Sequence, residues 1–137
     1  MSRFPSDGPL RYSRTAEGGY KLIVEVHPTI TAFYRTLVPK AVRLNTQRYE
    51  PHISVVRKES PIILAAWGIH EGEKVDFEYE SEIMNDELYY WLPVHSQRLR
   101  EIRIELGLPS MSVWSRPPDG ADVFHTTIGN TKELKQP

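Results

Sequence analysis

Two stretches of this sequence, residues 49–57 (YEPHISVVR) and 123–128 (VFHTTI), each place a histidine two positions before a hydroxyl residue. Both stretches are rich in β-branched and aromatic residues, so each is predicted to be a strand. Side chains at positions i and i+2 of a strand point to the same face. Each strand therefore presents an imidazole beside a hydroxyl. We call these two pairs the histidine units: His52 with Ser54, and His125 with Thr127.

The elements predicted around the histidine units follow the same order in both halves of the chain. Residues 20–27 (YKLIVEVH) form a predicted strand, and helically spaced apolar residues predict a helix over 29–38, before the first unit. Residues 88–95 (LYYWLPVH) form another predicted strand, and a helix is predicted over 96–106, before the second unit. The two halves share almost no sequence identity, so the repeat is one of layout only.

This repeated order predicts one α+β domain spanning residues 1–137, a length that suits a single domain. Residues 73–80 (EKVDFEYE) alternate strictly and add a half-exposed antiparallel strand. Residues 1–18 contain proline and glycine and little periodicity, and we interpret them as an extended N-terminal arm. We expect a bilobal fold, with two antiparallel sheets related by a pseudo-twofold axis around a central cleft and the helices outside.

Composition restricts the classes of function. The chain has no cysteine, which excludes disulfides, a thiol nucleophile and thiolate metal sites. Its net charge of -1 conceals an excess of five positive charges over residues 1–57 and of seven negative charges over 58–95. That distribution favours a small anionic ligand over a long nucleic acid. The sequence has no long apolar run and no apolar segment near Met1, so we expect no membrane partner and a cytoplasmic location.

A third histidine has the same spacing to a hydroxyl residue. His27 lies two positions before Thr29, but Pro28 between them disrupts the strand geometry that would align the two side chains. We interpret Thr29 instead as the cap of the following helix. Chance would give about 0.7 such spacings among five histidines, so one unit alone is weak evidence and the matched pair is stronger. His70 and His95 have no such partner, and we interpret them as structural or surface residues.

The paired units suit the cleavage of a phosphodiester. Two histidines on opposite sides of one phosphate can remove a proton from the attacking oxygen and deliver one to the leaving oxygen. An imidazole can take either role near neutral pH. Ser54 and Thr127 would then hydrogen-bond the non-bridging oxygens. The sequence lacks HxH and HExxH spacings, so we expect neither a metal nor another cofactor. The alternative is that His52 and His125 are structural residues of their strands.

The histidine units within this layout resemble the 2H phosphoesterase superfamily, which includes 2',3'-cyclic phosphodiesterases and RNA-end-processing enzymes. Several stretches look more specifically like the phage anti-CBASS nucleases: residues 33–40 (FYRTLVPK), 49–57 (YEPHISVVR), 102–109 (IRIELGLP) and 124–132 (FHTTIGNTK). The resemblance implies an enzyme that degrades cyclic di- and trinucleotide signals of bacterial antiphage defence, such as cGAMP. It would open their 3'–5' bonds without a metal, in the cytoplasm of an infected bacterium, and so serve immune evasion.

The resemblance also implies roles for individual residues. His52 and His125 would be the acid–base pair, in an order that the sequence leaves open, and the hydroxyls of both units would bind phosphate. Aromatic residues that stack the bases are expected, and the candidates are Tyr12 in the arm and Trp67. Tyr12 could instead pack within the arm, and Trp67 could fill the core. Lys132, Glu133 or a partner subunit would close the site at its C-terminal side.

Two other functions stay open at this point. The chain could be a 2H phosphodiesterase that acts on RNA termini or on 2',3'-cyclic phosphates. It could also be a non-catalytic sponge that binds cyclic nucleotides, which would need hydroxyls and aromatic rings but no titrating histidines. Of the three functions, only the enzyme of RNA termini would require a polymeric nucleic acid.

Overall fold

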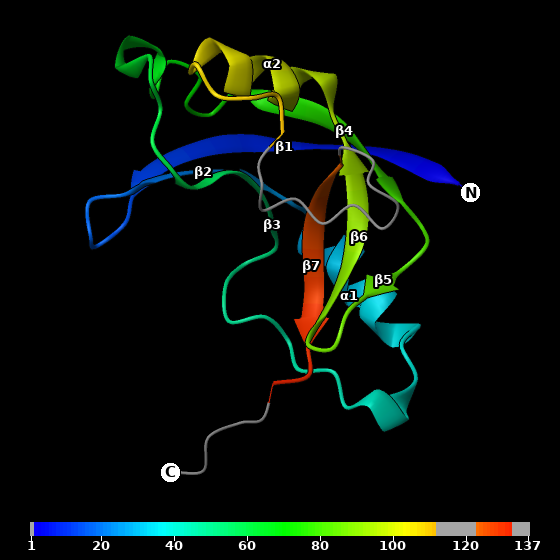
Figure 1. The fold of residues 1–137 in the computed structure, drawn as a ribbon. Helices are drawn as coiled ribbons and strands as arrows, with labels where there is room; N and C mark the ends of the chain where they lie inside the picture. Colours follow the sequence, from blue (N-terminus) through cyan, green and yellow to red (C-terminus); the bar gives the residue numbers. More distant parts are fainter. Residues whose placement is uncertain (1, 112–122, 133–137) are drawn as a thin grey trace.

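The computed structural model describes residues 2–111 and 123–132, and within these ranges the chain forms one antiparallel sheet and two α-helices (Figure 1). The elements are β1 (Arg3–Arg14), β2 (Tyr20–Glu25), α1 (Pro28–Thr36), η1 (Lys40–Val42), β3 (His52–Glu59), η2 (Leu64–Ala66), β4 (Lys74–Glu80), β5 (Met84–Asn85), β6 (Tyr89–His95), α2 (Gln97–Glu105) and β7 (Phe124–Asn130). The strand order is β4-β1-β2-β3-β7-β6-β5, and β4 also pairs with β6. That additional pairing closes six strands into an antiparallel barrel, with β5 as one extra strand beside β6.

The expected bilobal fold, with two sheets around a central cleft, is wrong. Tyr79 of β4 pairs with Val94 of β6, and Ile53 of β3 pairs with Thr126 of β7, so both halves of the chain belong to a single closed sheet. Most strands and both helices lie where the sequence pattern predicts them. The error arises because the order of elements along a chain does not determine which strand edges meet.

Residues 1–18 are not an extended arm, because most of them form β1, a twelve-residue strand of the barrel. Residues 3–9 pair with β4, whereas residues 10–14 pair with β2. β1 therefore passes from one neighbour to the other and helps to close the barrel. Figure 1 shows it as a long strand that extends from the N-terminus past β4 toward β2.

Proline and glycine residues interrupt the strand pattern of β1 in the sequence, but the structure accommodates them. Pro5 and Pro9 lie in the half of the strand that pairs with β4 but not with β2, and a strand with only one paired edge can accommodate proline. Gly8 lies close to the adjoining strand: a Cβ at this position would stand 1.8 Å from the backbone oxygen of Glu25. Only glycine allows the two backbones to approach this closely.

The helix starts follow from local sequence, with one correction. Pro28 occupies the first turn of α1, as expected, but the N-cap residue is His27 rather than Thr29, and no side chain caps this end. α2 is capped by Ser96, as predicted: its Oγ accepts a hydrogen bond from the backbone N–H three residues on. The same Oγ donates to the backbone oxygen of Asp76 at 3.0 Å, which ties the start of α2 to β4.

The core lies between the strands and α2, and a smaller cluster lies under α1. The main core consists of apolar residues from most strands and from one face of α2, among them Leu10, Leu22, Ile53, Val94, Leu99, Ile102 and Leu106. The smaller cluster joins α1 to β6 and β7: Tyr34, Val38, Leu92 and Ile128. Neither α-helix in the described part of the chain has the length and apolar character of a membrane span.

Arg103 of α2 is the one charged side chain that is completely buried within the described residues. Its guanidinium forms a bidentate ion pair with Glu59, with Nη1 and Nη2 donating to the two carboxylate oxygens at 2.9 and 2.8 Å. Nη1 also donates to the backbone oxygen of Val55, and Nε donates to that of Pro109, both at 2.8 Å. Arg103 thus joins α2 to β3 and to the segment that follows the helix.

Candidate functional site

The antiparallel pairing of β3 with β7 brings the two histidine units together. Ile53 pairs with Thr126, and both side chains are buried. In an antiparallel pair, the residues flanking such a position lie opposite one another on the other face of the sheet. We call the resulting group the quartet: His52 opposite Thr127, and Ser54 opposite His125.

The positions of the quartet residues in the sheet determine how far apart they are expected to lie. Its two histidines are diagonal neighbours, and diagonal positions of an antiparallel pair are separated by about 7 to 8 Å. Each histidine faces the hydroxyl of the other unit across the strands. All four side chains are half-buried, so they are held by neighbours yet remain open to a ligand from solvent.

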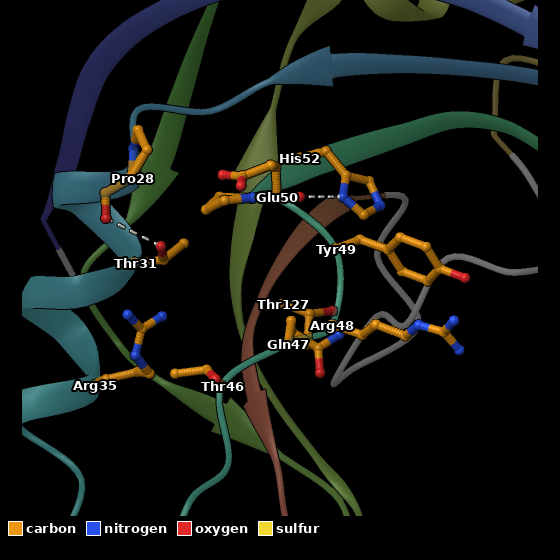
Figure 2. A pocket seen from close by; sticks show the side chains of 11 residues that line it. Pro28, Thr31, Arg35, Thr46, Gln47, Arg48, Tyr49, Glu50, His52 and Thr127 are labelled. Carbon is orange, nitrogen blue, oxygen red and sulfur yellow. Dashed lines mark hydrogen bonds between the residues drawn. The ribbon is translucent and has the colours of Figure 1, made fainter.

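A cleft of about 200 Å³ opens beside His52 and Thr127 (Figure 2). One wall belongs to α1 and the other to the segment 46–51, which leads into β3. Figure 2 shows Arg35 of α1 on one side and Arg48, Tyr49 and Thr127 on the other. We call this space the site cleft.

The protonation state of His52 follows from its contacts. Its Nδ1 lies 2.7 Å from the backbone oxygen of Glu50. A carbonyl oxygen can only accept a hydrogen bond, so Nδ1 carries the proton and donates it. Nε2 is then left with its lone pair free to accept a proton.

Burial lowers the pKa of His52 below the ordinary value of 6.5, although the hydrogen bond to Glu50 acts in the opposite direction. The positive charges of Lys21 and Arg57 also lower this pKa. Glu25 lies opposite His52 on β2, but its carboxylate accepts a hydrogen bond from Nε of Arg11. His52 is therefore neutral at pH 7 and suited to act as a base.

If His52 is the base, the acidic limb of kcat/KM should have its midpoint below pH 6.5. Protonation of a group with a lowered pKa begins only at more acidic pH, so activity should be retained at pH 6.5 and lost below it. Replacing Lys21 by methionine should move the midpoint toward 6.5, because one of the nearby positive charges is removed. The pH profile of kcat/KM and an NMR titration of His52 measure both effects, and a midpoint above 6.5 would contradict the assignment.

His125 is positioned from the side of β6. Pro93 pairs with it in the sheet, and the ring of Trp91 lies 6.2 Å from the imidazole at an interplanar angle of 63°. Trp91 is only 5% exposed and is therefore a buried residue. This buried ring limits the orientations that the imidazole can adopt.

Several cations surround the site cleft. Arg35 lines the α1 wall, and its Nη1 donates to the backbone oxygen of Ile128 at 3.3 Å. Arg48 lines the opposite wall, and Lys21 is near enough to His52 to lower its pKa. Positive charge around a small cleft raises the local concentration of an anionic ligand.

The structure does not bring Tyr12 and Trp67 to the site cleft. Their rings meet edge to face, with centroids 4.9 Å apart and an interplanar angle of 83°. Both pack against the main core, and the ring of Tyr20 also meets that of Trp67 edge to face. Tyr12 pairs with Leu22 on β2, whereas His52 pairs with Glu25 further along the same strand.

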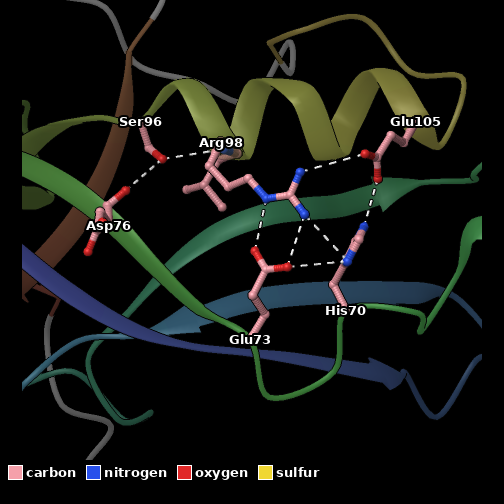
Figure 3. Close-up of polar contacts among 7 residues, drawn as sticks. His70, Glu73, Asp76, Ser96, Arg98 and Glu105 are labelled. Atoms are coloured by element: carbon pink, nitrogen blue, oxygen red, sulfur yellow. Dashed lines mark hydrogen bonds and ion pairs between the residues drawn. The ribbon is translucent and has the colours of Figure 1, made fainter.

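His70 and His95 bind carboxylates of the protein itself. His70 lies between Glu73 and Glu105, with nitrogen–oxygen distances of 3.3 and 2.8 Å, and Arg98 joins the same cluster (Figure 3). This cluster ties the turn before β4 to α2. Nε2 of His95 lies 2.5 Å from Oε2 of Glu80, which joins β6 to β4.

Comparison with family models, with curated proteins and with solved structures finds no match to this chain. Among residues 2–111 and 123–132, no three His, Asp or Glu side chains are grouped so that they could hold a metal ion. Of the residues expected to close the site, Lys132 lies with its Nζ 4.9 Å from the ring centre of Tyr89, and Glu133 is outside the described residues.

Proposed function

We propose that this protein is a metal-independent phosphodiesterase that cleaves the 3'–5' bonds of cyclic di- and trinucleotides. The observation that carries the proposal is the quartet, in which two imidazoles and two hydroxyls from distant parts of the chain share one face of adjacent strands. The substrate class comes from the sequence resemblance to phage anti-CBASS nucleases. Its biological role would be to remove signals of bacterial antiphage defence.

The two histidines would divide the proton transfers. Nε2 of His52 accepts the proton of a ribose 2'-hydroxyl, and that oxygen attacks the adjacent phosphorus. The bond from phosphorus to the 5'-oxygen breaks, and His125 donates a proton to this leaving oxygen. The products of the step are a 2',3'-cyclic phosphate and a free 5'-hydroxyl, so a cyclic substrate is opened.

The hydroxyls and the surrounding cations would stabilise the phosphate during this step. Ser54 and Thr127 can donate hydrogen bonds to the non-bridging oxygens, where negative charge develops in the transition state. Each hydroxyl lies opposite the histidine of the other unit, so the phosphate is contacted from both strands. Arg48 and Lys21 add long-range attraction for the phosphate groups.

A panel of cyclic di- and trinucleotides, incubated with the protein in excess EDTA, tests the proposal. We expect ring opening, with 2',3'-cyclic phosphate ends as the first products detected by mass spectrometry. The chelator should not slow the reaction, because the proton transfers are assigned to imidazoles.

Other outcomes of the same panel would contradict the proposal in distinct ways. Turnover of 2',3'-cyclic mononucleotides without opening of the cyclic oligonucleotides would favour an enzyme of RNA termini. Tight binding with the intact ligand recovered would indicate a sponge. Loss of all activity on addition of EDTA would show that a metal takes part.

A further inference from the structure

We propose that Tyr49 is the residue that stacks a nucleobase beside the site cleft. This inference rests on the proposed function, since it takes the ligand to be a nucleotide. It replaces the two aromatic residues chosen from the sequence, whose rings contact each other in the core. Tyr49 precedes the first histidine unit by three residues, and no sequence pattern marks it as a stacking residue.

The position of Tyr49 carries the inference. Its side chain is 60% exposed, and it lines the site cleft together with His52 and Thr127. In Figure 2 the rings of His52 and Tyr49 extend in the same direction, away from α1. A base attached to a ribose whose phosphate lies beside the His52 imidazole would therefore find the Tyr49 ring on the same side.

The surroundings of the ring suit a nucleotide. Nζ of Lys21 lies 5.3 Å from the ring centre and the guanidinium of Arg48 lies 5.7 Å from it. Both distances are near the outer limit of about 6 Å for a cation over a ring, so neither group is packed closely on it. These cations would instead hold the phosphates on either side of a stacked base.

The chain also offers a matched control. Phe33 is 56% exposed, close to the value for Tyr49, but it lines a separate apolar groove beside Phe4 and Tyr79. Phe33→Leu removes a similar area of exposed aromatic surface without touching the site cleft. Tyr49→Phe keeps the ring and removes only the hydroxyl, whereas Tyr49→Leu removes the ring.

The test is the binding of adenosine and guanosine 3'-monophosphates against ribose 5-phosphate, measured by calorimetry. Stacking on one aromatic ring should make the nucleotides bind roughly tenfold more tightly than the sugar phosphate. Tyr49→Leu should remove this preference, and Tyr49→Phe and Phe33→Leu should retain it. Equal binding of nucleotide and sugar phosphate by the natural protein, or a preference that survives Tyr49→Leu, would overturn the inference.

This test separates the inference from the proposed function. Binding of mononucleotides does not require cleavage, so a preference that depends on Tyr49 in a protein without turnover would leave the inference standing and remove the phosphodiesterase. Cleavage of cyclic dinucleotides with no effect of Tyr49→Leu on KM would do the reverse. With both correct, Tyr49→Leu should raise KM about tenfold and change kcat much less.

Discussion

Replacing His52 or His125 by alanine should lower the turnover of a cyclic dinucleotide by roughly a hundredfold to ten-thousandfold, the usual effect of removing a general acid or base. Each histidine is assigned one proton transfer, so neither can replace the other. The measurement is kcat/KM in EDTA at pH 7, with the melting temperature recorded for each variant. His52→Asn is a useful third variant, because its amide can still donate to the backbone oxygen of Glu50.

The chain supplies a matched control in its third histidine with the same spacing. His27 precedes Thr29 by two positions, but it is exposed and lies at the start of α1, outside the sheet. His27→Ala should leave both turnover and stability unchanged. If His52→Ala or His125→Ala keeps full activity, the quartet is not the catalytic centre, and the same holds if His27→Ala is equally damaging.

Arg103→Met should destabilise the protein by about 3 to 5 kcal/mol, as expected when one partner of a buried ion pair is removed. The substitution leaves the carboxylate of Glu59, which is 15% exposed, without the bidentate contact that compensates its burial. It also leaves the backbone oxygens of Val55 and Pro109 without this donor. Urea unfolding followed by circular dichroism measures the change.

Arg11 is the comparison for this prediction, since it also contacts carboxylates but at the surface. It pairs with Glu25 and Glu71, and all three side chains are close to half exposed. Arg11→Met should change the unfolding midpoint very little. The double variant Arg103→Met/Glu59→Leu should regain part of the lost stability, because no charge is then buried alone. An Arg103→Met protein as stable as the natural one would contradict the assigned role.

Local elements of this fold could be predicted because their signals lie within a few residues. Ser96 can cap a helix whatever the tertiary structure around it, and Pro28 favours the first turn of a helix. The strand β1 was missed for the same reason. Pro5, Gly8 and Pro9 weaken a strand when judged locally, and their compatibility depends on β4 and on Glu25, which no local pattern includes.

In the candidate site, too, local features could be predicted from sequence and tertiary ones could not. The pairing of His52 with Ser54, and of His125 with Thr127, is set by strand alternation alone and was therefore accessible from sequence. The layout repeat suggested two facing sheets, whereas the two units lie on paired strands of one sheet. Whether two strands face each other across a gap or share hydrogen bonds depends on the closure of the barrel, which involves every strand pair.

The aromatic residues show where sequence reasoning lacked information. Residue type and neighbourhood favour Tyr12 and Trp67 as stacking residues, yet both rings belong to a packed aromatic group with Tyr20. Tyr49 lies in a segment without regular structure, and its place beside His52 depends on the path of that segment. Exposure and orientation of a side chain in such a segment follow from tertiary contacts.

The closed barrel affects the order in which the quartet can form during folding. The two units of the quartet lie on β3 and β7, which are far apart along the chain, and β7 is the last strand of the described chain. Contacts of this kind form late and slowly in folding, because a long loop must close first. A partly folded chain can thus contain both helices and most strands without any competent centre. The quartet is therefore complete only once β7 has paired with β3.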